Sequence, residues 1–260
     1  MSDTPRGSYL WYDLMTTDPA GAKAFYTKVA GWGTEKWKGG IPDMPYDMWT
    51  TQNGPIGGVM QLPEAAAQAG APPHWLAYIH TPDVDATVAR AQQLGGTLLH
   101  PPMDLPEVGR FATLADPFGA VFAAFAPQGE GTAYDGMPRV GDISWNELMA
   151  GDLDKAWSFY SDLFGWTKGE AMDMGPMGIY QTFHTGQEHP MGGMMNKPPE
   201  VPVSAWMHYI RVDDVEAAVD RVKQNGGQLM HGPMEVPGGK VAACTDPQGA
   251  WFALHWVAEG

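Results

Sequence analysis

The sequence is poor in cysteine, in basic residues and in long apolar runs, and each shortage excludes a class of protein. Cys244 is the only cysteine among 260 residues, so no disulfide can form within the chain and a reducing cytoplasm is expected. Lys and Arg number 15 against 30 Asp and Glu. The resulting net charge of −15 disfavours binding to nucleic acid or to an anionic membrane.

Sequence signals for membrane insertion, export and common cofactors are also missing. The longest apolar run is AVFAAFA, far shorter than a membrane span, and the opening MSDTPRGSYLWYDL has no basic flank followed by an apolar stretch. A cytoplasmic protein is therefore expected. The chain has no HExxH, GxGxxG or GxxxxGK[ST] pattern, so neither a zinc site of that type nor a nucleotide cofactor is indicated. No cofactor is expected.

What the chain does contain is a long internal repeat. A shift of 134 residues aligns 7–32 with 141–166, and 10 of the 26 positions are identical. A shift of 131 pairs GGTLLHPPMDLP with GGQLMHGPMEVP, and a shift of 130 pairs DPFGAVFAAF with DPQGAWFALH. The period is far longer than that of a solenoid repeat, so the chain is a duplicated domain.

Each copy contains two units of the same type. A short strand-like run is followed by an acid at a helix start, such as Asp18, Asp83 or Asp152, where the side chain can cap free N–H groups. An amphipathic helix then ends at glycine, and three short strands follow. For the unit opened by Asp83 these strands are expected near 97–99, 110–114 and 120–125. The predicted fold is α+β, with four βαβββ units in tandem duplication.

Glycine- and proline-rich segments mark the expected boundaries. The stretch PQGEGTAYDGMPRV separates the copies and predicts a first domain at 1–127, a linker at 128–139 and a second domain at 140–260. LPEAAAQAGAPP divides the first copy, and NKPPEVP divides the second copy at the matching place. His100 and His231 precede proline-containing segments and are predicted to be strand-end residues.

The segments TTDPAGAKAFYTKVAGW, GDLDKAWSFYSDLFGW and VGRFATLADPFGAVFAAF resemble the vicinal oxygen chelate superfamily, which includes glyoxalase I, bleomycin resistance proteins and extradiol dioxygenases. The repeated opening WYDL…FY…GW resembles a two-domain glyoxalase-family or hydroxylase-like group that includes the mycobacterial 27 kDa antigen type. The resemblance covers nearly the whole chain. It implies two curved mixed-sheet half-barrels, each with a cavity, and it says little about the reaction because this fold hosts many chemistries.

Members of the superfamily with metal chemistry carry His, Glu or Gln ligands at set strand positions. Carried over residue by residue, these positions hold Trp11, Trp145, Leu76, Met207, Ala123 and Ala253, and the remaining position lies in GGVMQ and GGMMN. Trp, Leu and Ala offer no ligand, and a Met thioether suits soft metals only. No metal site is therefore expected. The cavity is expected to bind its ligand through Trp11, Trp145, Met60, Met195, Leu76 and Met207.

Two carboxylates and one histidine remain as candidates for chemistry. Side chains alternate along a strand, so Asp13 shares a face with Trp11, and Glu147 shares one with Trp145. A carboxylate in an apolar pocket has a raised pKa and suits proton transfer, although such acids also occur at strand ends without a catalytic role. His255 shares a strand face with Trp251 and is expected to meet Glu147, unless it is a hydrogen-bonded core residue.

Three functions are compatible with these residues. The first is metal-independent binding of a small apolar or aromatic molecule. The second is a lyase, isomerase or oxygenase of the glyoxalase and dioxygenase type, metal-independent or metal-assisted, with Glu147 or Asp13 as acid/base. The third is an interaction protein with a vestigial pocket. A small-molecule ligand is the expected partner, and the chain is expected to be a monomer or a homodimer.

Overall fold

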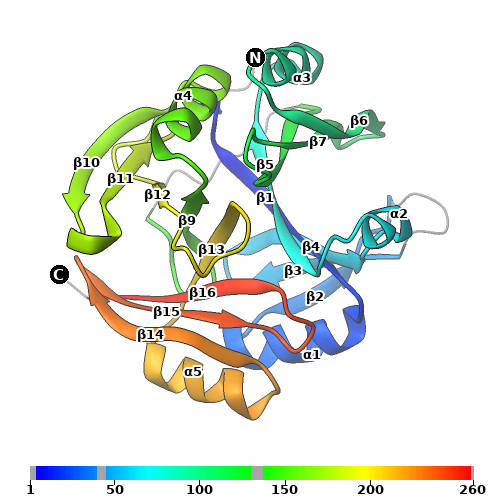
Figure 1. Ribbon diagram of the computed structural model, residues 1–260. Coiled ribbons are helices and arrows are strands. Elements are labelled where there is room, and N and C mark those ends of the chain that lie inside the picture. The colour runs from blue at the N-terminus through cyan, green and yellow to red at the C-terminus, as the bar shows by residue number, and fades with distance from the viewer. Residues whose placement is uncertain (1–3, 40–44, 130–136, 259–260) are drawn as a thin grey trace. The chain divides into compact units, whose positions relative to one another are not determined.

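The computed structural model describes residues 4–39, 45–129 and 137–258. The first sheet has the order β2-β3-β4-β1-β5-β8-β7-β6, and the second has the order β10-β11-β12-β9-β13-β16-β15-β14 (Figure 1). The two orders are the same once the numbers of the second are reduced by eight. This identity confirms the predicted α+β fold with a tandem duplication.

The strands and helices follow the chain in two equivalent series. The first sheet consists of β1 (Tyr9–Thr16), β2 (Gly33–Lys36), β3 (Tyr46–Thr51), β4 (Gly54–Gln61), β5 (His74–His80), β6 (Thr97–Leu105), β7 (Gly109–Ala115) and β8 (Val121–Pro127). The second consists of β9 (Ile143–Ala150), β10 (Thr167–Asp173), β11 (Ile179–His184), β12 (Gly192–Asn196), β13 (Ala205–Arg211), β14 (Gln228–Val236), β15 (Gly239–Thr245) and β16 (Trp251–Val257). The helices are α1 (Pro19–Ala30), α2 (Glu64–Gln68), α3 (Val84–Gln93), α4 (Leu153–Phe164) and α5 (Val215–Gln224), with a 3₁₀ turn η1 (Gly175–Met177).

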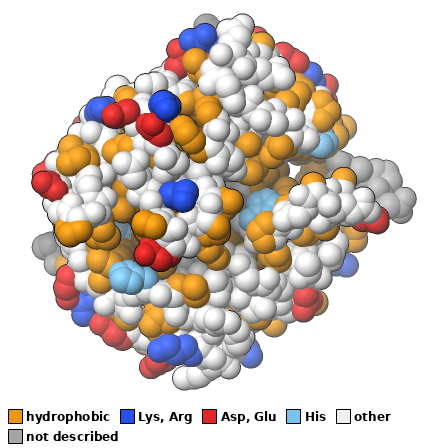
Figure 2. All heavy atoms as spheres, in the orientation of Figure 1, with side chains coloured by type: hydrophobic (Ala, Val, Ile, Leu, Met, Phe, Trp, Pro, Cys, Tyr) orange, Lys and Arg blue, Asp and Glu red, His pale blue; other side chains and the backbone are white. Residues whose placement is uncertain are grey.

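Local sequence signals account for the four longer helices. Asp18, Asp83, Asp152 and Asp214 are their N-caps, and each carboxylate accepts a backbone N–H three residues later at 2.9–3.0 Å. These bonds satisfy amides that have no partner within the helix. Over α5, acidic and basic side chains lie next to one another in Figure 2, in agreement with the ion pair between Lys240 and Glu216.

Three details differ from the sequence predictions. The segment 62–73, expected only as a divider, contains the short helix α2. Strand β6 continues through Pro101 and Pro102 to Leu105, and β14 runs from Gln228 to Val236. His100 and His231 therefore lie within strands and not at strand ends. Both strands are at the edge of their sheet, where proline costs no ladder hydrogen bond.

The described chain divides into two compact units that cut across the two copies. Unit 1 contains the described residues within 1–11, 77–136 and 145–206, and unit 2 contains those within 12–76, 137–144 and 207–260. Each unit thus combines half of one copy with half of the other. In unit 1, α3 contacts α4, and in unit 2, α1 contacts α5. The predicted domain limits at 127 and 140 remain predictions, and 130–136 lies outside the described residues.

Aromatic residues of the repeated FY…GW motif form the core of unit 1. Phe159 and Tyr160 of α4 pack edge to face on Phe122 of β8, with ring centroids 6.1 and 5.4 Å apart. Tyr160 also stacks on Trp166 at 5.4 Å. All four side chains are nearly or fully buried, so this contact between the copies removes a large apolar area from water.

A buried polar network fixes the same interface. Trp206 donates to the hydroxyl of Tyr160 at 3.0 Å, and that hydroxyl donates to Asp116 at 3.4 Å. Asp116 also accepts the N–H groups of Phe118 and Ala120, so it holds the tight turn before β8. Burial raises the pKa of Asp116, and it raises the pKa of Tyr160 well above 10. A tyrosine of the second copy is therefore bonded to a turn of the first.

Unit 2 repeats this network with the copies exchanged. Trp75 donates to Tyr26 at 3.1 Å, and Tyr26 donates to Asp246 at 3.3 Å. Phe25 and Tyr26 pack on Phe252 of β16 at 5.9 and 5.4 Å. Here the helix belongs to the first copy and the turn to the second. The two copies are thus tied together reciprocally.

Each motif tryptophan also bonds to the other copy. Trp166 donates to the carbonyl of Gly7 at 2.9 Å, and Trp32 donates to the carbonyl of Gly141 at 2.7 Å. Gly7 has a φ of 90°, and a Cβ built there would lie 2.5 Å from the Trp166 indole nitrogen. Only glycine fits at this position. The Gly7 and Gly141 pair in the repeat therefore serves close packing.

Because the cores are shared, neither copy should fold alone. We expect residues 1–129 and 137–260, expressed as separate chains, each to be unfolded or aggregated, since α1 and α4 would each lose the strands on which they pack. Mixing the two chains should restore a cooperative melt by circular dichroism. A stable, cooperative melt of either chain by itself would contradict the shared core.

His208 should make the protein sensitive to acid. It lies on β13, 2% exposed, with its ring 5.0 Å from that of Tyr12. Burial lowers the pKa of His208 from 6.5 to about 3, so between these values only the unfolded state takes up the proton. Stability from this residue is therefore complete above pH 6.5 and decreases as the pH falls toward 3.

We expect the wild type to lose about 2 kcal/mol of unfolding free energy through this residue between about pH 7.5 and about pH 5. His208→Gln should lose about that much less over the same interval, because it has no imidazole to protonate. Urea unfolding at both pH values measures the difference. Equal losses in the two proteins would show that His208 does not contribute.

Candidate functional site

The predicted carboxylates lie at equivalent places on two parallel strand pairs. In the second copy, Glu147 of β9 is paired in register with Gly193 of β12. In the first copy, Asp13 of β1 is paired with Gly58 of β4. Both pairs are at the centre of their half-sheet, where strand geometry fixes the direction of the side chains.

A tyrosine reaches each carboxylate from the neighbouring strand. Tyr180 of β11 donates its hydroxyl to Glu147 at 3.0 Å, and the indole N–H of Trp145 donates to the Tyr180 oxygen at 2.7 Å. We call these three residues the Trp145–Tyr180–Glu147 triad. All three belong to unit 1. The predicted cavity tryptophan is thus also a hydrogen-bond donor that orients the tyrosine.

Glycine on the strand between makes this arrangement possible. A Cβ built on Gly193 would lie 2.1 Å from a ring carbon of Tyr180, and one on Gly58 would lie 2.0 Å from the Tyr46 hydroxyl. Real atoms do not approach so closely, so the tyrosine crosses its neighbouring strand only at a residue without a side chain. The GG pairs in GGVMQ and GGMMN therefore serve the tyrosine.

The first copy has the same bond in a more buried setting. Tyr46 of β3 donates to Asp13 at 2.6 Å, and Asp13 is only 3% exposed. Glu147 is half-buried, as are Trp145 and Tyr180. The two copies therefore differ in access: solvent and small molecules reach Glu147 more readily than Asp13.

The proton of the triad stays on the tyrosine. Burial, and then the negative charge of Glu147, raise the pKa of Tyr180 well above 10. At neutral pH Tyr180 is therefore a hydrogen-bond donor to the carboxylate. A short bond from a neutral hydroxyl to a carboxylate is a strong, charge-assisted interaction, and it holds Glu147 in one orientation.

Tyr46 and Tyr180 were not predicted from the sequence. They are related by the same shift of 134 residues that relates Asp13 to Glu147, so the repeat contained the signal. Their surroundings hid it: residues 40–44 lie outside the described part of the chain, and the segments MPYDMW and MGIYQT share little else.

His255 is held by a hydrogen bond on β16. Its Nδ1 lies 2.9 Å from the Ser144 hydroxyl, and its ring is 6.4 Å from that of Tyr209 in an edge-on arrangement. Burial, and then the charge of Arg211, lower the pKa of His255 to about 4, so it is neutral at neutral pH. His255 belongs to unit 2 and Glu147 to unit 1, and their meeting remains a prediction.

The other predicted site residues lie on strands as expected from the repeat. Trp11, Met60 and Met195 are half-buried on β1, β4 and β12, whereas Leu76 and Met207 are 0% and 7% exposed on β5 and β13. Met60 and Met195 follow the crossing glycines by two residues, so by alternation they share the face of Asp13 and Glu147. Their role in ligand binding remains a prediction.

The donor set does not fit a metal of the superfamily type. The carried-over ligand positions Ala123 and Ala253 are fully buried alanines, and the opening positions are tryptophans. Within the described residues, no three His, Cys, Asp or Glu side chains are grouped closely enough to hold a metal ion. Hard divalent cations need oxygen or nitrogen ligands, which these positions do not offer.

No helix among the described residues is long and apolar enough to cross a membrane.

Two curated relatives match nearly the whole chain. CFP32 of Mycobacterium tuberculosis, a protein named as a glyoxylase, is 33% identical over 262 residues, which cover 97% of this chain and 96% of the relative. The anthracycline biosynthesis protein DnrV of Streptomyces peucetius is 30% identical over 272 residues, which cover 98% of this chain and 94% of the relative.

Solved structures share the fold at low sequence identity. The Mn(II)-bound glyoxalase of Novosphingobium aromaticivorans has a TM-score of 0.64 at 18% identity, covering 100% of this chain and 84% of that one. The 2,3-dioxygenase LapB of Pseudomonas sp. KL28 has a TM-score of 0.65 at 13% identity, covering 100% and 94%. At such identities the likeness shows the fold alone.

A family model agrees with both comparisons. The model for the Glyoxalase/Bleomycin resistance protein/Dioxygenase superfamily matches residues 8–123 and 142–254, which are the two copies of the internal repeat. The chain therefore belongs to the glyoxalase, bleomycin resistance protein and dioxygenase superfamily, with the family's unit present twice.

Proposed function

We propose that the protein binds a small apolar or aromatic molecule, without a metal ion, on the face of β9 that carries Trp145 and Glu147. The observation that supports this most is the Trp145–Tyr180–Glu147 triad. It combines an aromatic surface with an oriented, partly exposed carboxylate in one compact unit. A mostly apolar wall with one well-placed polar group is typical of small-molecule sites.

The triad favours a ligand that donates a hydrogen bond. Tyr180 donates its proton to Glu147, and Trp145 donates to Tyr180, so the polar end of the triad is an acceptor. A phenol or another flat molecule with an O–H or N–H group matches a carboxylate acceptor beside an indole ring. The name of the Streptomyces relative, which refers to anthracycline biosynthesis, is compatible with an aromatic ligand class.

A second function is favoured by the same carboxylate. Glu147 is half-exposed and oriented by a tyrosine that keeps its own proton, which suits it to accept a proton from a bound molecule and return it. Such chemistry would make the protein a metal-independent lyase or isomerase. The near-complete burial of Asp13 favours Glu147 over Asp13 in this role.

Metal loading gives the first test. We expect no stoichiometric metal in protein incubated with Mn²⁺, Fe²⁺, Ni²⁺ or Zn²⁺ and then desalted, because the carried-over ligand positions are Trp, Leu, Met and Ala. Elemental analysis measures the content, and thermal melts with each ion measure any stabilisation. One tightly held ion per chain together with a raised Tm would overturn metal-independent binding and favour metal-assisted chemistry.

Variants of the triad give the second test. A panel of flat phenols such as 2-naphthol should bind, as measured by ligand-observed NMR and isothermal titration calorimetry. Tyr180→Phe and Glu147→Gln should each weaken that binding about 5- to 30-fold, which corresponds to the loss of a charge-assisted hydrogen bond. The matched variants Tyr46→Phe and Asp13→Asn, in the first copy, should leave the affinity unchanged.

The control variants also separate the outcomes. Equal losses in both copies would mean that the first copy binds as well, and a loss only in the Asp13 and Tyr46 variants would overturn the proposal. The same samples, prepared in D₂O with an enolisable hydroxyketone, distinguish binding from proton transfer. Exchange of the carbon-bound proton that depends on Glu147 would identify an enzyme, and a bound but unchanged ligand would identify a binding protein.

A further inference from the structure

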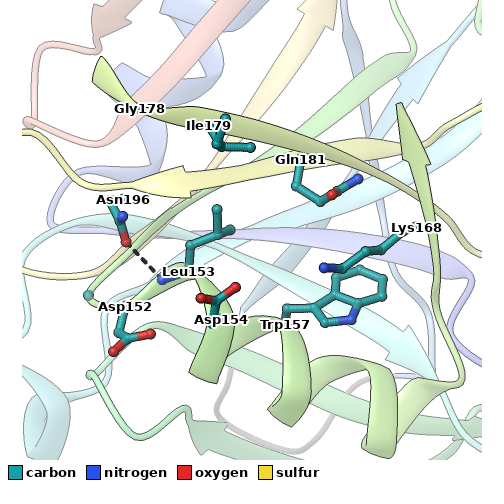
Figure 3. Close-up of a pocket in the computed structure, with 10 residues that line it drawn as sticks. Asp152, Leu153, Asp154, Trp157, Lys168, Gly178, Ile179, Gln181 and Asn196 are labelled. Atoms are coloured by element: carbon teal, nitrogen blue, oxygen red, sulfur yellow. Dashed lines mark hydrogen bonds between the residues drawn. The ribbon is translucent and has the colours of Figure 1, made fainter. Parts of the chain in front are cut away.

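A second hollow lies in the second copy, away from the triad. It is a groove of about 700 Å³ between the start of α4 and strands β10 and β11, and all of its lining residues belong to unit 1. Figure 3 shows α4 contributing Leu153, Asp154 and Trp157, with Ile179 and Gln181 opposite on β11.

The equivalent place in the first copy is bridged by an ion pair. The shift of 134 residues relates Trp157 to Lys23 and Gln181 to Asp47. Lys23 of α1 and Asp47 of β3 form a salt bridge between helix and strand. The second copy has an indole and a neutral amide at these two positions. The duplication has therefore replaced a bridging ion pair with groups that line a groove.

The amide side chains of the groove are oriented by bonds behind them. Gln181 donates its Nε2 to the backbone carbonyls of Gly169 and Thr182, both at 3.0 Å, which leaves its carbonyl oxygen as an acceptor. Asn196 accepts the backbone N–H of Leu153 at 2.8 Å, which leaves its NH₂ group as a donor (Figure 3). Each amide thus has one fixed polar atom to offer a ligand.

Two charged groups complete the polar lining. The carboxylate of Asp154 and the ammonium of Lys168 are exposed, and neither forms an ion pair with a described residue. Lys168 lies over the ring of Trp157, 5.4 Å from its centroid. The charges are of opposite sign, so the groove has donors and acceptors but little net field.

Apolar surface lies between these polar groups. Trp157 and Leu153 are half-buried, and Ile179 is 42% exposed. The exposure of Ile179 in a strand is unusual for a large aliphatic side chain, because it leaves apolar area in water. A ligand with an apolar face and polar edges would cover this surface and satisfy the polar groups around it.

We propose that this groove binds a neutral sugar or polyol ring. Such a ring presents C–H groups on its faces, which suit the indole of Trp157 and the side chains of Leu153 and Ile179. Its hydroxyls both donate and accept, so they match the Asp154 carboxylate, the Gln181 oxygen and the remaining donors. The volume is within the range of small-molecule pockets.

Other ligand classes fit the groove less well. An anion would need free N–H groups at the start of α4, but Leu153 N is bonded to Asn196 and Lys155 N to Asp152. An organic cation would compete with the Lys168 ammonium, which already lies over Trp157. A divalent ion would need more ligands than Asp154, and no group of three suitable side chains occurs within the described residues.

The test uses the full-length chain and a panel of defined probes: glucose, galactose, maltose, cellobiose and myo-inositol. Saturation-transfer NMR identifies binders, and calorimetry measures their affinity. We expect at least one probe to bind with a Kd of about 1–10 mM or tighter, the range of a weak single-ring site. No binding of any probe at about 50 mM would overturn the proposal.

A matched variant tests the location. Trp157→Lys combined with Gln181→Asp introduces the ion pair of the first copy, which that copy tolerates, so the fold should be kept and the Tm should change little. Sugar binding should fall at least about tenfold. Asp154→Asn and Trp157→Phe, which keep the shape of the groove, should give smaller losses and serve as a second measure if the double variant is unstable.

Glu147→Gln should leave sugar binding unchanged, because Glu147 does not line the groove. This control makes failure of the groove distinguishable from failure of the triad. Binding that is lost in Glu147→Gln but kept in the double variant would place the sugar at the triad and overturn the assignment to the groove. Retention of full affinity in all the groove variants would overturn it as well.

Discussion

The bond from Tyr160 to Asp116 is the contact on which the rest of the structure depends, together with its counterpart from Tyr26 to Asp246. Each bond ties the helix of one copy to the last turn of the other, inside a fully buried aromatic core. A buried carboxylate without a partner is costly, so the turn and the helix need each other. This reciprocity holds the four units together in pairs and keeps the sheet faces in place.

Much of the fold could be predicted because it is encoded locally. Asp18 and Asp152 announce helix starts, Gly31 and Gly165 their ends, and the duplication repeats the pattern. The pairing of units across the copies could not be predicted in the same way. A phenylalanine at helical spacing, such as Phe159, indicates that a helix has a buried face, but it does not say which strand covers that face. Only Phe122, more than thirty residues earlier, answers that question.

The candidate site was predictable in part for a similar reason. Strand alternation placed Asp13 and Glu147 beside the two tryptophans, because the period of a strand is fixed by its backbone. The tyrosines were missed because they lie two strands away and reach the carboxylates across Gly58 and Gly193. A side chain that crosses a neighbouring strand leaves no periodic signal in its own segment. What marks it is the glycine, whose purpose is visible only in three dimensions.

Two independent differences separate the copies, and both have the same sense. In the first copy Asp13 is buried under its tyrosine, and Lys23 bridges helix to strand. In the second copy Glu147 is half-exposed, and Trp157 lines an open groove. Because the copies share their cores, one can lose closing contacts while the reciprocal packing of the other maintains the fold. Duplication with shared cores therefore explains how the second copy became the more accessible one: the first supplies rigidity, and the second presents the surfaces on which small molecules can be recognised.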